Sequence, residues 1–229
     1  MGSEMCIRDR DNGLSENTIV IFSSDNGTSK AAKIEALAKK GHIVSAGYRG
    51  SKADLWDGGH RVPFIVKWPG IVKPSSISDE LICLTDIFAT VSEITKKDMP
   101  SESGEDSVSF LDALKGEKIH STRAGVVHHS ISGHFGYRLG KWKLLLAQGS
   151  GGWSSPKESE SEGMPVAQLY NLEIDPAETE NLYATHPEIA EKLLQQLELD
   201  IKTGRSTRGE CSENDIDNII LWKNDENKQ

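Results

Sequence analysis

The feature that most constrains the fold is an uninterrupted apolar run near the start of the chain. Residues 17–24 read NTIVIFSS, and the centre of this run, Ile-Val-Ile-Phe, is β-branched or aromatic. Continuous runs of this kind are typical of strands buried on both faces of a parallel sheet. Such a strand needs neighbouring elements, and few residues precede this one. We therefore expect the fold to have begun further upstream.

The first ten residues, MGSEMCIRDR, have neither helical nor strand periodicity. They are interpreted either as an expression or sequencing scar or as the frayed end of a helix. Residues 1–12 are therefore left out of the predicted core.

The remainder divides into two parts with different patterns. Residues 1–116 predict the α/β domain, with helices at 29–40, after Thr85 and at 108–115, and strands at 17–24, 63–68 and 80–84. Residues 117–229 predict a smaller domain, with short strands at 124–129, 134–139, 142–147 and 168–172. A helix at 187–203 has one apolar face and should cover that antiparallel sheet. Within the strand at 142–147, Trp142, Leu144 and Leu146 alternate as one face.

Two polar segments complete this division. Residues 148–165 are rich in Gly, Ser and Glu, which predicts a mobile surface loop, and the tail from residue 204 is mostly polar. We also expect strands 18–23 and 64–68 to be neighbours in one sheet, separate from the sheet of the smaller domain.

Bulk properties exclude several classes of function. The formal net charge is −9 and the pI is near 5.3, which argues against a nucleic-acid partner bound through its phosphates. The sequence has no stretch of the ~20 apolar residues that a transmembrane helix needs. The three cysteines, Cys6, Cys83 and Cys211, have neither disulfide-framework nor zinc spacing.

The first chemically informative segment is Ser24-Asp25-Asn26-Gly27, directly after the apolar run. Ligands of open α/β sheets bind beyond the carboxyl ends of strands. The Asp25 carboxylate and the Asn26 amide are hard oxygen donors that suit Ca²⁺ or Mg²⁺. The alternative is a simple turn, because Asn-Gly is a strong turn signal.

The second segment, residues 48–63, reads YRGSKADLWDGGHRVP. It gathers Arg49, Lys52, His60 and Arg61 around three glycines, so that its cations could hold an anionic group. It does not have the spacing of a P-loop. The alternative is a basic loop solvated at the surface.

In this order and spacing, the two segments resemble the sulfatase family of the alkaline-phosphatase-like superfamily. The matching stretches are T-x-V-x-F-x-S-D-N-G at 18–27 and R-G-x-K-x-x-x-x-D-G-G-x-R-x-P at 49–63, extended by W-P-G at 68–70. The resemblance continues through residues 137–143 and 168–182 and covers most of 13–203. It implies the C-terminal portion of an α/β/α sandwich, followed by a small antiparallel sheet with one long helix.

The resemblance also implies roles for individual residues. Asp25 and Asn26 match two ligands of a single divalent cation, usually Ca²⁺, with Mg²⁺ as the alternative. Lys52 matches the lysine that binds a sulfate oxygen. Asp57 and Arg61 are expected to pair and hold the loop. Asp57 stands where a glutamate is commoner, and Ala53 where a glycine is.

Two further side chains are candidate substrate contacts. His60 lies within the same motif, although a packed or capping histidine is the alternative reading. Trp153, at the centre of the loop 149–156, could stack on a sugar, and the alternative is a disordered surface loop.

The family's nucleophile is a formylglycine made within C/S-x-P-x-R, and none of the three cysteines has that context. The resemblance therefore places the nucleophile and a first pair of metal-binding aspartates upstream, and it predicts that this chain alone is inactive. It implies a sulfate ester, of a carbohydrate or an aryl alcohol, as substrate. A phosphoester or phosphonate hydrolase and a non-catalytic sulfatase-like binding protein remain alternatives. A periplasmic, secreted or lysosome-like location is expected from the family, and no signal peptide is visible in the sequence.

Overall fold

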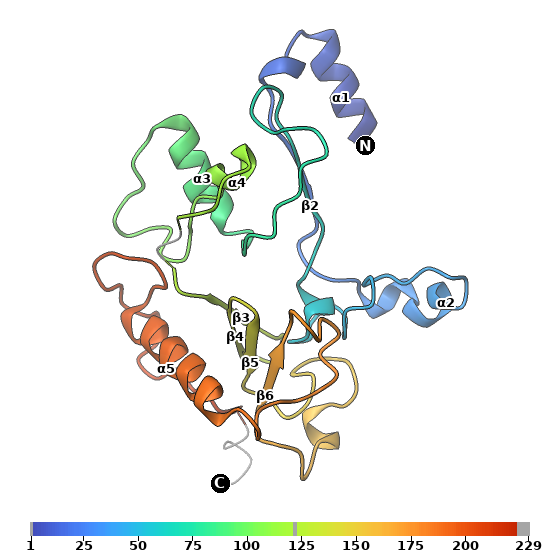
Figure 1. Ribbon diagram of the computed structural model, residues 1–229, viewed down its shortest axis with the longest axis vertical. Helices are drawn as coiled ribbons and strands as arrows, with labels where there is room; N and C mark the ends of the chain where they lie inside the picture. Colours follow the sequence, from blue (N-terminus) through green and yellow to red (C-terminus); the bar gives the residue numbers. More distant parts are fainter. Residues whose placement is uncertain (1, 121–122, 224–229) are drawn as a thin grey trace. The chain divides into compact units, whose positions relative to one another are not determined.

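A computed structural model describes residues 2–120 and 123–223 (Figure 1). Contacts between residues divide the chain into two compact units, which are considered separately below. The first comprises residues 1–24 and 63–122, and the second comprises residues 25–62 and 123–229. Such units are defined by contacts alone, so the division into domains at residue 116 stays a prediction.

The first unit contains a two-stranded antiparallel sheet and short helices. Strand β1 (Val20–Ser23) pairs with β2 (Phe64–Lys67), with Val20 opposite Lys67 and Ser23 opposite Phe64. The helical elements of this unit are α1 (Gly2–Asp11), η1 (Ser15–Asn17), α3 (Asp86–Thr95) and α4 (Leu111–Lys115). The predicted pairing of strands 18–23 and 64–68 is confirmed. Helix α1 agrees with the helical reading of the first ten residues.

The apolar run does not form a strand buried on both faces. Within the described residues β1 pairs with β2 alone, and antiparallel, so the predicted parallel sheet is wrong for this part of the chain. Phe22 and Ile65 are cross-strand partners and are 62% and 61% exposed. Successive side chains of a strand point to opposite faces, so half of this run lies on a face that the described residues leave open.

Two other local predictions are corrected. Residues 80–84, all of which are described, belong to no strand. The helix expected at 29–40 is broken into η2 (Lys30–Ala32) and α2 (Ile34–Ala38). Lys33 separates the two with a φ of 56°, a left-handed conformation that a continuous α-helix excludes.

The second unit is built on a four-stranded antiparallel sheet in the order β3-β4-β5-β6. The strands are β3 (Val126–His129), β4 (Phe135–Leu139), β5 (Trp142–Leu145) and β6 (Gln168–Asn171). Helix α5 (Pro187–Thr203) lies along this sheet and contacts β4 and β5 (Figure 1). The separate antiparallel sheet covered by one long helix is therefore confirmed.

Both faces of this sheet are covered, because alternate residues enter different cores. On the α5 side, Leu144 and Leu169 pack with the buried helix residues Leu193 and Leu197. On the other side the core consists of Leu55, Trp56, Leu145, Ala147, Tyr170 and Leu172. Since Leu55 and Trp56 belong to the basic segment 48–63, the second face of the sheet is what supports that segment.

Residues 148–165 form a loop with many exposed residues, as predicted, but part of it is packed, and its predicted mobility stays a prediction. Ser150 and Ser161 are fully buried within it. The Glu158 carboxylate accepts hydrogen bonds from the backbone N–H groups of Gln148, Gly149 and Gly151, at 2.9, 3.1 and 3.0 Å. One carboxylate thus supplies the acceptors that a strand partner would otherwise provide. The short η4 helix (Glu158–Glu160) follows this turn.

Candidate functional site

The two segments with candidate ligands lie against each other in the second unit. The N–H of Gly27 donates to the carbonyl of Gly59 at 2.8 Å, and the N–H of Lys52 donates to the carbonyl of Thr28 at 3.0 Å. A Cβ added to Gly27 would lie 1.9 Å from the Gly58 carbonyl oxygen, so only glycine permits this approach. Asp25 and Asn26 are therefore held on a backbone that is hydrogen-bonded directly to residues 48–63, which are called the Lys52 segment below.

The donors at this position fit part of a divalent-cation site. Asp25 is exposed, Lys52 is half-buried, and the Asn26 Oδ1 atom is buried. A carboxylate and an amide oxygen are hard ligands of the type that Ca²⁺ prefers, but Ca²⁺ takes six to eight oxygens. Across residues 2–120 and 123–223, no cluster of three or more His, Cys, Asp or Glu side chains could hold a metal ion. The metal site of Asp25 and Asn26 thus stays a prediction that requires further ligands.

The Lys52 segment departs from relaxed geometry at Ala53. Ala53 has a φ of 85°, in the region that favours glycine. By the resemblance described above, Ala53 stands where a glycine is commoner. The chain therefore keeps the backbone turn that glycine would permit, at a cost on the order of 1–2 kcal/mol for the alanine.

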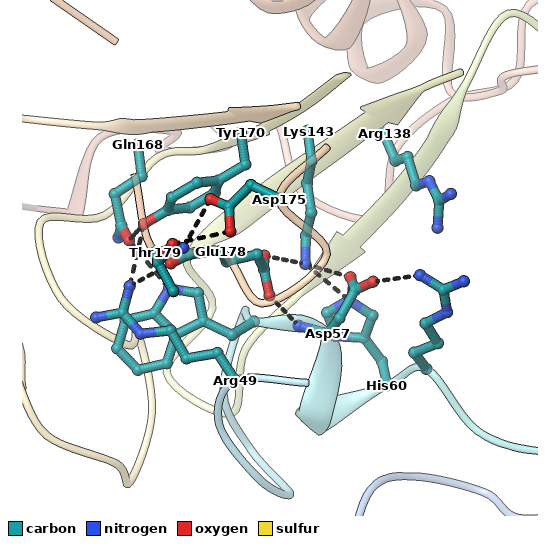
Figure 2. Close-up of polar contacts among 12 residues, drawn as sticks. Arg49, Asp57, His60, Arg138, Lys143, Gln168, Tyr170, Asp175, Glu178 and Thr179 are labelled. Atoms are coloured by element: carbon teal, nitrogen blue, oxygen red, sulfur yellow. Dashed lines mark hydrogen bonds and ion pairs between the residues drawn. The ribbon is translucent and has the colours of Figure 1, made fainter. Parts of the chain in front are cut away.

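A buried ion cluster fastens this segment to the sheet, and Figure 2 shows Lys143 of β5 pointing between two carboxylates. The fully buried Lys143 Nζ lies 2.7 Å from Asp57 Oδ1 and 2.8 Å from Glu178 Oε1. The N–H of Asp57 also donates to Glu178 Oε2 at 2.6 Å. Arg61 Nη1 lies 3.2 Å from Asp57 Oδ2. Asp57 and Arg61 are therefore in contact, and their supporting role at the site stays a prediction.

Arg49 fastens the beginning of the same segment. Its Nη1 donates to the Glu178 carbonyl at 2.8 Å and to the Tyr170 hydroxyl at 3.2 Å (Figure 2). Its guanidinium also lies 3.7 Å from the centre of the Trp56 ring, as a cation–π contact. The alternative reading of residues 48–63 as a solvated basic loop is wrong, because Arg49 and Arg61 contact protein groups and Asp57, Gly58 and Gly59 are buried.

His60 belongs to this cluster. Its Nε2 lies 3.3 Å from Lys143 Nζ and 3.5 Å from Asp57 Oδ1, and its ring centre is 4.2 Å from that of His128. Burial and the Lys143 charge lower the pKa of His60, and burial holds the pKa of His128 well below its usual value. These are the surroundings of a packed, neutral histidine. A substrate contact through His60 stays a prediction.

The two carboxyl groups of the cluster respond differently to the same environment. Burial alone would raise the pKa of Asp57, but hydrogen bonds from His60 and Lys143 outweigh it and hold the pKa well below its usual range. Burial raises the pKa of Glu178 above its usual value in spite of the Lys143 charge. Both carboxyl groups lie within 2.8 Å of Lys143 Nζ, so the lysine is shared between them.

The lowered pKa values of His60 and His128 predict a loss of stability in mild acid. An unfolded histidine takes up a proton near pH 6.5, whereas the folded rings, with their lowered pKa values, resist it. The free energy of unfolding should therefore fall as the pH drops below about 6.5, by up to ~1.4 kcal/mol per pH unit for each histidine.

Urea unfolding of the chain between about pH 7.5 and pH 5.5 measures this slope. A His128→Gln variant should lose less stability over that interval, because only one histidine with a lowered pKa remains. The raised pKa of Glu178 acts in the opposite direction at lower pH, so the two proteins are compared at each pH. Equal slopes in the two proteins would contradict the prediction.

Sequence reasoning missed Lys143, Glu178 and Asp54. Lys143 stands between Trp142 and Leu144 on a strand, and the sequence pattern predicted only the face of Trp142, Leu144 and Leu146. The signal that could have revealed it is Leu145 and Ala147, two apolar residues on the same face as Lys143, which indicate that this face is also covered. Asp54 is 3% exposed and accepts hydrogen bonds from the loop that carries Trp153, which is 41% exposed. No local sequence pattern predicts the hydrogen bonds between Asp54 and the loop that carries Trp153.

Comparison with known proteins adds an independent line of evidence. A family model described as Sulfatase matches residues 10–97. The N-acetylgalactosamine-6-O-sulfatase of Bacteroides thetaiotaomicron is 33% identical over 188 residues, which are 81% of this chain and 36% of that protein. Arylsulfatase G of Rattus norvegicus is 31% identical over 204 residues, which are 82% of this chain and 38% of that protein. The chain thus spans well under half the length of either relative.

Solved structures also show similarity to sulfatases. A Bacteroides thetaiotaomicron structure from work on glycosaminoglycan metabolism has a TM-score of 0.71 and 29% identity, covering 86% of this chain and 41% of that one. A sulfatase from Pseudoalteromonas sp. has a TM-score of 0.67 at 19% identity, covering 92% of this chain and 42% of that one, which is a likeness of fold alone. The predicted fold class is confirmed: α/β of the alkaline-phosphatase-like type, with a small antiparallel sheet and one long helix.

Proposed function

Because this chain belongs to the sulfatase family, we propose that it supplies two metal ligands and the sulfate-binding lysine of an enzyme that hydrolyses sulfate esters. The observation that carries the proposal is the pair of backbone hydrogen bonds that joins the two candidate segments, Gly27 to Gly59 and Lys52 to Thr28. Through them, Asp25, Asn26 and Lys52 belong to one structural unit.

Each of these side chains has a definite task in the proposed reaction. Cleavage of a sulfate ester builds negative charge on the sulfuryl oxygens and on the leaving oxygen. Lys52 would place its ammonium on a sulfate oxygen, where a preorganised positive charge stabilises the transition state more than the ground state. Asp25 and Asn26 would help to hold a Ca²⁺ ion, which when bound would polarise the sulfate group. The ion cluster around Lys143 keeps the backbone of the Lys52 segment in place.

The nucleophile would come from outside this chain, because its sequence has no C/S-x-P-x-R segment. Residues that act as a unit in catalysis are not additive, so a chain with only part of the machinery should have no measurable turnover. We therefore propose that residues 1–229 are inactive alone and that a formylglycine in an upstream segment performs the attack.

A sulfated carbohydrate is the substrate class that the molecule supports best. The relative from Bacteroides thetaiotaomicron is named for a 6-O-sulfated N-acetylgalactosamine. In this chain Trp153 is 41% exposed on a loop whose backbone is bonded to the Lys52 segment. An exposed aromatic ring on a loop bonded to the segment of a candidate anion-binding cation suits a sugar that carries a sulfate group.

The test uses two proteins. One is residues 1–229, and the other is the product of the reading frame extended upstream to include a C/S-x-P-x-R segment, made together with a formylglycine-generating enzyme. We expect the longer protein to release sulfate from 6-O-sulfated N-acetylgalactosamine and from 4-nitrophenyl sulfate, and the short chain to release none.

Two outcomes would overturn the proposal. Faster cleavage of 4-nitrophenyl phosphate than of the sulfate would make the protein a phosphoester hydrolase. An upstream frame without C/S-x-P-x-R, in a protein that binds the sulfated sugar but never cleaves it, would make it a sulfatase-like binding protein.

A further inference from the structure

Asp54, two residues after Lys52, joins two separate segments of the second unit. It is 3% exposed. Its Oδ2 accepts a hydrogen bond from the N–H of Ser51 at 2.8 Å, within the Lys52 segment. Its Oδ1 accepts from the N–H groups of Trp153 and Ser154, at 2.8 and 2.9 Å. One buried carboxylate thus satisfies three backbone donors, two of which lie about a hundred residues away in the sequence.

The peptide groups of Trp153 are held from two directions. While Asp54 accepts from its N–H, the ammonium group of Lys30 donates to its carbonyl oxygen. Lys30 follows the Asp25-Asn26 segment, and Asp54 follows Lys52. Both candidate segments therefore contact the backbone of one tryptophan, and the hydroxyls of Ser51 and Ser154 add a 3.3 Å contact beside it.

The residue before Trp153 must be a glycine for this contact to form. A Cβ added to Gly152 would lie 2.3 Å from the Ala53 carbonyl oxygen and 2.7 Å from Asp54 Oδ1. The loop therefore approaches the Lys52 segment at a distance that no other residue type allows. Glu158 holds the other side of the loop through Gln148, Gly149 and Gly151.

We propose that Asp54 is a positioning residue that holds the backbone of Trp153 against the segment that carries Lys52, so that the exposed Trp153 side chain and Lys52 recognise a sugar ring and its sulfate group together. The proposal rests on the proposed function and deepens it by assigning specificity for the sugar to the Asp54–Trp153 contact. In the wild type one oxygen of Asp54 accepts from Trp153 and Ser154 and the other accepts from Ser51. An asparagine at position 54 has one oxygen and one NH2 group, so it would turn a donor toward one of these two sets of N–H groups, and it would also remove the negative charge from the remaining hydrogen bonds. The backbone that carries Trp153 would then be held less firmly, while Lys52 kept its own charge.

The first experiment measures amide hydrogen exchange in residues 1–229 and needs no catalytic activity. In Asp54→Asn, the amides of Trp153 and Ser154 should exchange about 10-fold faster, because each loses a buried charge-assisted hydrogen bond. Amides of α5 should exchange at the wild-type rate, which shows that the fold persists.

Asp175→Asn is the matched control, since the Asp175 carboxylate accepts from the N–H groups of Thr179 and Glu180 at 2.7 and 2.9 Å. It should accelerate exchange at those two amides and leave Trp153 unchanged. If Asp54→Asn does not fold, Gly152→Ala keeps the carboxylate but forces the loop away, and it should accelerate the same two amides. Unchanged exchange at Trp153 and Ser154 in the folded variant would overturn the proposal.

The second experiment is a double-mutant cycle in the longer, active protein. Asp54→Asn and Trp153→Ala should each raise KM for 6-O-sulfated N-acetylgalactosamine about 10-fold, and the double variant should raise it no further. Inhibition by inorganic sulfate, which has no sugar ring, should be unchanged in Trp153→Ala. Additive effects on KM would show that Asp54 acts only on stability and would overturn the proposal. Absence of any sulfatase activity would overturn the proposed function and leave the exchange result as a separate finding.

Discussion

Replacing Lys143 by methionine should lower the free energy of unfolding by about 3–5 kcal/mol, because it leaves two buried carboxylates without their shared cation. Lys143 is fully buried, and its Nζ lies 2.7 Å from Asp57 and 2.8 Å from Glu178. Methionine retains most of the apolar volume of the lysine stem, so the loss reports the charge rather than a cavity. Urea unfolding followed by circular dichroism measures the difference.

Lys141→Met is the matched control, two residues away. Lys141 pairs with Glu173 at 3.2 Å, but both side chains are about half exposed or more. Exposed ion pairs contribute about 0–1 kcal/mol, so this variant should unfold close to the wild-type midpoint. Equal effects of the two substitutions would mean that the buried cluster contributes no more to stability than a surface pair, and that other contacts hold the Lys52 segment.

Replacing Lys52 by alanine in the longer, active protein should lower kcat/KM for a sulfate ester by about 10²–10³-fold. That is the usual effect of removing one preorganised charge-stabilising group. The loss should lie mainly in kcat, because the sulfate oxygens are most negative in the transition state. Lys67→Ala is the control, since Lys67 is an exposed lysine of β2 in the other compact unit.

Asp25→Ala should produce a loss of similar size with a different signature. The variant should require a higher Ca²⁺ concentration for half-maximal activity, because the proposal assigns Asp25 as one of the oxygen ligands of the cation. Initial rates measured over a Ca²⁺ titration distinguish Asp25→Ala from Lys52→Ala. Full activity in either variant would show that the family is right and the site is wrong.

The sequence predicted those elements whose signals are local. Helix α5 begins at Pro187 and ends before Gly204, which has a φ of 67°, and both residues are strong boundary signals. The four short strands of the second unit were also found, because their alternation and their turn residues lie within a few positions of one another. The apolar run at β1 was misjudged, since the direction and number of strand partners depend on distant residues.

At the candidate site, too, the sequence predicted what depends on local signals and missed the contacts between distant residues. Asp25, Asn26 and Lys52 could be named from two short motifs, but the contacts that support them come from far along the chain. Lys143 and Glu178 reach Asp57 from positions more than eighty residues away. Asp54 reaches Trp153 across a similar distance. A loop that is rich in Gly, Ser and Glu has the composition of a mobile segment, and its composition does not reveal that Asp54 and Glu158 accept hydrogen bonds from its backbone.

The position of Lys143 also protects the pairing of the sheet. On β5 the side chains of Trp142 and Leu144 face α5, whereas Lys143 and Leu145 face the Lys52 segment. A slip of one residue between β5 and its neighbours would reverse every side chain on the strand. It would drive the ammonium group into the leucine core beneath α5 and leave Asp57 and Glu178 facing an apolar side chain. The ion cluster therefore favours one strand register. The same lysine that supports the candidate site makes the shifted register energetically unfavourable.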